Sequence, residues 1–226
     1  MLWYKAWLET RWRFVAMMIS TAAIVFLIPP LLNVNAQKVW VLIALEISLM
    51  NCAAALILAG SGINSQTSYS AVSGFHGSMF FTLSLPVSRR RLFAVRTGLG
   101  ALETCAFVVM TTALVPLFHP ETSFDQLLRY GARAVICSLA VYAFSAFLAC
   151  FLDEMWQFSG GILLLSGFFG FESRFPPLSS FSPLRGLSLF PSSLAAPTPW
   201  ALLFTSVALI GVFLFSSVYL LERKEY

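Results

Sequence analysis

Residues 64–96 read NSQTSYSAVSGFHGSMFFTLSLPVSRRRLFAVR, and the rest of the chain is organised around this stretch. Its first residues are polar turn formers, and Pro86 breaks it, because proline has no amide donor and clashes with a preceding helical turn. A run of arginines at residues 89–91 then stands at the entry of the next apolar segment. Such a basic cluster is typical of the cytoplasmic end of a membrane-spanning helix. We therefore predict that residues 61–98 form a cytosolic loop.

The chain has 226 residues, of which 58% are hydrophobic and only 11% are charged. A soluble domain carries about 25% charged residues, whereas a helix that crosses a bilayer needs about 20 apolar residues. The composition therefore predicts an all-α, polytopic membrane protein with a single domain over residues 1–226. The net charge of +4 does not indicate nucleic acid as a partner, because the basic residues lie at the membrane boundaries.

Apolar runs along the chain predict six transmembrane helices with both termini in the cytosol. The predicted spans are residues 14–32, 39–60, 99–118, 130–152, 156–171 and 200–221. Nine lysines and arginines then fall inside and four fall outside, which supports this orientation. In residues 1–13, Trp3 and Trp7 share one helical face, and we predict an interfacial elbow helix that leads into the first span. The alternative is that these residues are the cytosolic start of the span itself.

Residues 172–199 form the longest outer segment and are rich in proline, serine, phenylalanine and leucine. This segment is too apolar for a free loop and too interrupted for a span. One interpretation is a re-entrant hairpin that dips into the outer leaflet, with its backbone shielded by the spans. A structured outer loop is the second interpretation, and the residues favour neither.

Three ionisable residues lie inside predicted spans, where charges are costly unless they are paired or hydrated. Glu46 and Arg133 lie at similar depths from the outer side, which would allow a buried ion pair that either fixes helix packing or contacts a substrate. Glu103 lies about two helical turns from the inner end of its span. We expect it to meet a basic residue at the inner rim, such as one from the elbow segment.

Small residues allow two helices to approach each other closely. Glycine is concentrated at the start of the third predicted span and along the fifth. We predict that these glycines are packing positions rather than ligand sites: Gly98, Gly100, Gly160, Gly161, Gly167 and Gly170.

No constellation typical of an enzyme is found in the sequence. The motifs GxxxxGK[ST], GxSxG and HExxH are all missing, and the only histidines are His76 and His119. The cysteines stand alone in apolar segments and are expected to act as small buried hydrophobic residues: Cys52, Cys105, Cys137 and Cys150. We therefore predict that the protein is not an enzyme and binds no metal or cofactor of its own.

The segment FTLSLPVSRRRLFAVRTGLGALE, residues 81–103, resembles the loop and third span of ABC-2-type permeases, the membrane subunits of ATP-driven transporters. The span layout, the N-terminal YKAWLETRWRF and the charged tail LLERKEY are also similar to that family. The resemblance implies a short cytosolic coupling helix before the LSLP element, where this chain has an apolar patch. The ATPase-coupling residues implied in this way are Phe75, Met79, Phe80, Arg89, Arg90 and Arg91. Two alternatives stay open: the patch contacts lipid headgroups, and the arginines only orient the protein.

The resemblance also implies a function. The chain would be the permease subunit of an ABC transporter, an exporter by family habit, in the plasma (inner) membrane of a prokaryote. Two permease protomers, identical or different, would pair with two cytosolic ATPase subunits that bind ATP and magnesium, and membrane lipid would surround them. Two other classes are weighed against this one: a six-span membrane enzyme, and a membrane scaffold or immunity protein that transports nothing.

Overall fold

The computed structural model of the chain describes residues 2–32, 36–59, 88–152, 154–189 and 199–223. Every regular element in these ranges is a helix, which confirms the all-α prediction. The helices are α1 (Leu2–Leu32), α2 (Ala36–Ala59), α5 (Arg89–Phe118), α6 (Phe124–Ala149), α7 (Glu154–Arg174), α8 (Pro176–Ser179), α9 (Pro183–Leu187) and α11 (Trp200–Arg223).

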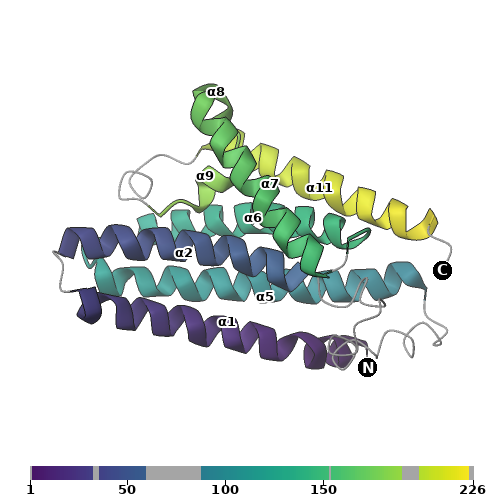
Figure 1. Cartoon of the computed structure of the whole chain (residues 1–226), viewed down its shortest axis with the longest axis horizontal. Coiled ribbons are helices and arrows are strands. Elements are labelled where there is room, and N and C mark those ends of the chain that lie inside the picture. The colour runs from purple at the N-terminus through teal and green to yellow at the C-terminus, as the bar shows by residue number, and fades with distance from the viewer. Residues whose placement is uncertain (1, 33–35, 60–87, 153, 190–198, 224–226) are drawn as a thin grey trace.

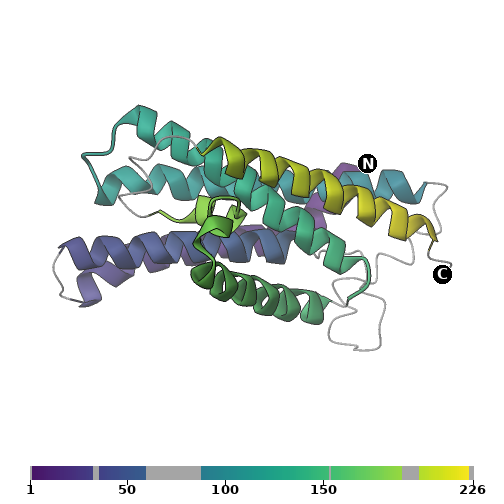
Figure 2. The ribbon, with the colours of Figure 1, turned by 90° about the horizontal axis from the view of Figure 1, so that it is seen from above.

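The long helices form a bundle with α6 at its centre (Figures 1 and 2). Helix α6 packs against α2, α5, α7, α9 and α11, whereas α1 packs against α2 and α5. In Figure 1, α1 therefore lies on one side of the bundle and α11 on the other. Helices α1 and α5 begin, and α11 ends, at the same end of the bundle, which we call the terminal end. We call the opposite end, where α2 and α6 begin, the far end.

Five helices are long and apolar enough to cross a membrane, which supports a membrane-embedded helical protein. The corresponding segments are Thr10–Leu27, Val39–Ala59, Arg90–Phe118, Phe124–Ala149 and Trp200–Arg223. The predicted fifth span, residues 156–171, lies in α7, which is not among these five. Helix α7 does carry the chain from the terminal end back toward the far end (Figure 1). The six-span topology therefore stays a prediction.

Helix α1 runs without interruption through the predicted elbow and the predicted first span. Residues 2–28 contain no glycine or proline that could bend the helix. A separate elbow helix is therefore not seen in the described part of α1, and residues 2–13 belong to the same helix as the predicted first span. The aromatic side chains of its first third are exposed, as expected for the headgroup layer: Trp3, Tyr4, Trp7 and Trp12.

Two other helices begin earlier than the sequence predicts, because capping serines stand in front of them. Helix α5 begins at Arg89 rather than at residue 99, and its N-cap Ser88 accepts a hydrogen bond from the Arg91 amide. Helix α6 begins at Phe124 rather than at residue 130, after a capping box formed by Ser123 and Gln126. With 30 residues, α5 is about 45 Å long, about 15 Å more than the hydrocarbon core of a bilayer. Its arginine-bearing first turns can therefore extend beyond the bilayer.

The interior of the bundle is filled by aliphatic side chains from every long helix except α7. Fully buried members include Val25, Ile43, Ile47, Leu56, Val108, Leu187, Leu189 and Leu202. Lipid tails are as apolar as these side chains, so in a membrane the bundle is held by close packing and hydrogen bonds rather than by the hydrophobic effect.

The described part of the predicted outer segment, residues 172–189, folds back into the bundle. Leu187 and Leu189 are buried, and the Leu189 amide donates a hydrogen bond of 3.2 Å to the Ser48 hydroxyl in α2. Ser48 lies twelve residues after Ala36, so this contact is about 18 Å from the far end of α2. Helix α9 therefore lies inside the bundle, between α2, α6 and α11, rather than on its surface.

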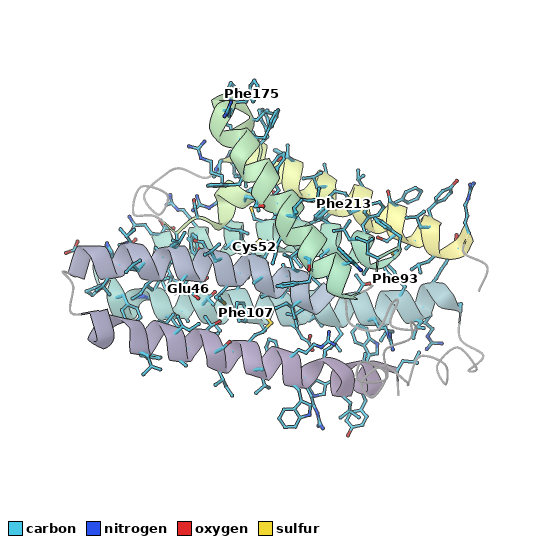
Figure 3. All side chains as sticks on the ribbon, in the orientation of Figure 1. Glu46, Cys52, Phe93, Phe107, Phe175 and Phe213 are labelled. Carbon is cyan, nitrogen blue, oxygen red and sulfur yellow. The ribbon has the colours of Figure 1, made fainter. Side chains whose placement is uncertain are left out.

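The C-terminal half of α7 leaves the bundle, as the position of Phe175 in Figure 3 shows. Its apolar side chains are exposed on several sides: Ile162, Leu163, Leu164, Phe168, Phe169 and Phe171. Among the described residues, a Cβ at Gly167 or Gly170 would meet no other atom within 4 Å, so these two glycines do not provide close packing within the described bundle. Packing is instead close at Gly161, where a Cβ would lie 2.9 Å from a methyl group of Leu56.

Candidate functional site

The predicted ATPase-coupling residues fall into two groups. The apolar members lie outside the described residues: Phe75, Met79 and Phe80. The basic members form the first turn of α5 at the terminal end: Arg89, Arg90 and Arg91. The Arg90 and Arg91 side chains are exposed, and Arg90 forms an ion pair with Glu222 of α11. An exposed ion pair contributes at most about 1 kcal/mol, so its main effect is to orient the end of α11.

Helix α5 is also fixed at the terminal end by a small apolar cluster. Phe93, one turn after the arginine run, packs with Ala149 and Cys150 of the α6 end and with Val218 and Leu221 of α11. A displacement of the first turn of α5 would therefore act on α6 and α11 as well. This contact gives the basic surface a direct mechanical connection to the centre of the bundle.

Glu103 lies in the interior at the contact between α5 and α1. It is 4% exposed, and one of its carboxylate oxygens accepts a hydrogen bond from the Thr10 hydroxyl. Thr10 belongs to the segment predicted as the elbow, so the partner comes from the expected region but is a hydroxyl rather than a basic side chain. The other oxygen, Oε2, has no hydrogen-bond partner among the described residues.

Arg133 and Glu46 occupy the membrane-spanning part of the bundle, but the structure does not bring them together. The Arg133 guanidinium lies over the ring of Tyr130, 5.5 Å from its centre, and the side chain is 7% exposed. Glu46 is half-buried in α2 (Figure 3). Both side chains are described, and no ion pair joins these two. Similar depth was not enough to predict contact, because depth leaves the angular position on each helix undetermined.

Arg133 belongs to a buried polar cluster, whose other members sequence reasoning missed. The Thr111 hydroxyl of α5 donates a hydrogen bond of 2.9 Å to Asn51 Oδ1 of α2. The Tyr130 hydroxyl of α6 lies beside Asn51 and donates a hydrogen bond of 3.3 Å to the Leu187 carbonyl. These three side chains are at most 1% exposed. The cluster therefore ties α2, α5, α6 and the end of α9 together inside the bundle. An asparagine in the middle of an apolar run was the available signal.

A second buried polar contact fixes the start of α7. The Gln157 amide nitrogen donates to the Leu56 carbonyl at 2.9 Å and to the Ser145 hydroxyl at 2.6 Å. Ser145 in turn donates to the same carbonyl at 3.1 Å. Together with the close contact at Gly161, these bonds hold the N-terminal half of α7 against α2 and α6.

The predicted buried cysteines differ in their surroundings. Cys137 and Cys150 are buried, Cys52 and Cys105 are half-buried, and none of the four forms a disulfide bond within the described residues. Within the described residues, no group of three or more His, Cys, Asp or Glu side chains could hold a metal ion.

Comparison of the chain with protein-family models, with curated proteins and with solved structures gave no match. The function is therefore inferred from the sequence and from the geometry described above.

Proposed function

We propose that the chain is the membrane permease subunit of an ABC transporter of the ABC-2 type, with an exporting role. The observation that carries this proposal is the element LSLPVSRRR, residues 83–91, which leads directly into α5. Two features of the described residues support it. They include five helices long and apolar enough to span a membrane, and Arg90 and Arg91 of this element are exposed at one end of the bundle.

In the proposed transporter, two cytosolic ATPase subunits dock at the terminal ends of two permease protomers. The apolar side chains Phe75, Met79 and Phe80 would seat in a groove of the ATPase, and the arginine run would flank that contact. The ATPases would bind ATP and magnesium, and their closure would press on the start of α5. The Phe93 cluster would pass this force to α6 and α11.

The membrane topology of the proposal has six spans with both termini cytoplasmic, in the inner membrane of a prokaryote. The terminal end, which carries the arginine run and the end of α11, would face the cytosol. Helix α7 would serve as the fifth span and α9 as a re-entrant element from the outer side. The depth of Leu189, about 18 Å below the far end of α2, supports the re-entrant assignment, because the surrounding helices shield its backbone.

The docking proposal can be tested with the change Phe80→Asp. A charge at an aromatic anchor should weaken the ATPase contact by about 2 kcal/mol or more, because the carboxylate would be desolvated without a partner. Phe124→Asp is the matched control, since Phe124 is 79% exposed at the far end of the bundle. The ATPase should co-purify from native membranes with the parent and with Phe124→Asp, but not with Phe80→Asp.

Equal recovery of the ATPase with both variants would show that Phe80 is not part of the interface. The arginine run would then be the next candidate to test. No co-purifying ATPase with the parent protein, in any detergent that keeps the bundle folded, would refute the transporter proposal. Membrane sidedness is tested separately by single cysteines at Arg91 and Glu121 in a cysteine-free background. A membrane-impermeant thiol reagent should label Glu121→Cys from outside the cell and Arg91→Cys only after the membrane is opened.

A further inference from the structure

The α5–α6 contact carries two polar sets with the same spacing. On α5 the set is Thr97, Thr104 and Thr111, and on α6 it is Gly131, Ser138 and Ser145. Seven residues are close to two helical turns, so each set lies along one face of its helix. All of these threonine and serine side chains are at most 9% exposed. We call the two sets, together with Thr112, the polar seam, which also borders α2 and α7: Thr111 bonds to Asn51 of α2, and Ser145 bonds to the Leu56 carbonyl and to Gln157.

Two contacts show that these faces meet. At one end of the seam, the Tyr142 hydroxyl of α6 donates a hydrogen bond of 3.0 Å to the Thr97 carbonyl. At the other end, a Cβ at Gly131 would lie 3.3 Å from the Thr112 methyl group. Ser138 lies on α6 between these levels. From Thr97 to Thr112 the seam is about 22 Å long, about three quarters of the hydrocarbon thickness of a bilayer.

Several hydroxyl groups along the seam lack the hydrogen bonds that such groups usually make. Serine and threonine in a helix commonly bond to a carbonyl one turn earlier, as Thr104 does to the Gly100 carbonyl at 2.8 Å. The hydroxyls of Thr97, Thr112 and Ser138 have no partner in the part of the chain that the structure describes.

Buried polar atoms in folded proteins are almost always hydrogen-bonded, to protein or to ordered water. Hydrocarbon cannot supply the missing partners, because lipid tails neither donate nor accept hydrogen bonds. A change of side-chain rotamer could let a hydroxyl bond to a carbonyl one turn earlier in its own helix, whereas a partner from a neighbouring helix would require a shift that the close contacts at Tyr142 and Gly131 oppose. Water is the ligand that fits small, separate sites of this kind.

We propose that water molecules are bound in the polar seam at the levels of Thr97, Ser138 and Thr112. A single protomer then holds internal hydration over most of its membrane thickness. This hydration lies inside one bundle, and it does not depend on the transport role proposed above.

Stability measurements distinguish a hydrated seam from a dry one. In a dry seam, Ser138→Ala and Thr112→Val would each remove an unpartnered buried hydroxyl, so the melting temperature should rise. In a hydrated seam each change removes a group that binds water, and the melting temperature should fall or stay unchanged. Thr104→Val is the control for loss of a hydroxyl that is already bonded within its own helix. A rise for both Ser138→Ala and Thr112→Val would overturn the proposal.

A second measurement reads water contact directly and does not depend on stability. Ser138→Cys and Ala134→Cys are compared in a background without the four native cysteines; Ala134 is 0% exposed and belongs to the apolar core. In D2O the thiol S–H becomes S–D, and infrared spectroscopy follows this exchange through the shift of the stretching band. The thiol at position 138 should exchange at least tenfold faster than the thiol at position 134. Equal exchange rates would show that water does not enter the seam.

Discussion

The change Gly100→Ala tests the central packing of the bundle most directly. Gly100 lies where α5 meets both α6 and α2. A Cβ at this position would lie 2.5 Å from the Tyr142 hydroxyl oxygen and 3.0 Å from the Leu58 carbonyl oxygen. Tyr142 is 3% exposed and donates to the Thr97 carbonyl, and the Leu58 carbonyl is backbone, so neither atom can move without shifting a helix or losing a hydrogen bond.

The expected size of the effect follows from three contributions. Replacing glycine by alanine inside a helix stabilises it by about 1 kcal/mol. Overpacking a close contact costs about 1–3 kcal/mol, and weakening the bond from Tyr142 to Thr97 costs about 1 kcal/mol more. The net result is a destabilisation of about 1–3 kcal/mol. For a chain of this size, each kcal/mol corresponds to a change in melting temperature of about 2–4 °C.

The assay is thermal unfolding of the purified protein in detergent, followed by tryptophan fluorescence. Gly211→Ala in α11 is the matched control, because a Cβ there would meet no other atom within 4 Å. Gly211→Ala should keep or raise the melting temperature, whereas Gly100→Ala should lower it. Adding Tyr142→Phe to Gly100→Ala should restore part of the loss, since it removes the closest oxygen. If Gly100→Ala is as stable as Gly211→Ala, the described contact between α2, α5 and α6 is incorrect.

Three further predictions follow from buried side chains. Thr10→Val should lower the melting temperature because it leaves the buried Glu103 carboxyl without its hydroxyl partner, and a double-mutant cycle with Glu103→Leu should give a coupling of about 1 kcal/mol; a coupling of zero would mean that the two do not interact. The effects of Glu46→Gln and Arg133→Gln on the free energy of unfolding should be additive within about 0.5 kcal/mol, because no ion pair joins the two side chains. A larger coupling energy would support the ion pair that was predicted from depth. Burial raises the pKa of the Glu172 carboxyl. The protonated carboxyl therefore stabilises the fold at a pH below its ordinary pKa, and this contribution is lost as the pH rises through the raised pKa. Glu172→Gln should therefore raise the melting temperature at about pH 8 and leave it unchanged at about pH 4, and an equal shift at both would exclude titration of Glu172 as the cause.

The sequence was sufficient to predict the helical bundle, because bilayer thickness sets the length of apolar run that a span needs. The positions of α2 and α11 follow from such runs. Helix ends were harder to predict, since they depend on single capping residues such as Ser88 and Ser123. A hydropathy pattern does not register these serines, and it placed the starts of α5 and α6 too late in the chain.

The side-chain contacts within the bundle were much less predictable. Glu46 and Arg133 have matching depths, but contact also requires that the two helices are rotated toward each other, which depends on all their neighbours. The glycines show the same limit: Gly100 and Gly161 pack closely as predicted, whereas Gly167 lies on the part of α7 that leaves the bundle. Asn51 was overlooked because a single polar residue does not change the average hydropathy of its run.

The position of α11 over α9 has a consequence for how the protein is made. A Cβ at Gly186 would lie 3.1 Å from a methyl group of Leu202, and the Thr205 hydroxyl donates a hydrogen bond of 2.7 Å to the Phe181 carbonyl. Helix α11 follows α9 in the chain, and it covers the segment that carries Leu187 into the bundle. Until α11 has been synthesised and inserted, this segment lacks the cover that α11 provides, so this part of the fold is completed only then. A nascent protein that stalls before Trp200 would expose this segment, and membrane proteases could recognise it as unfinished.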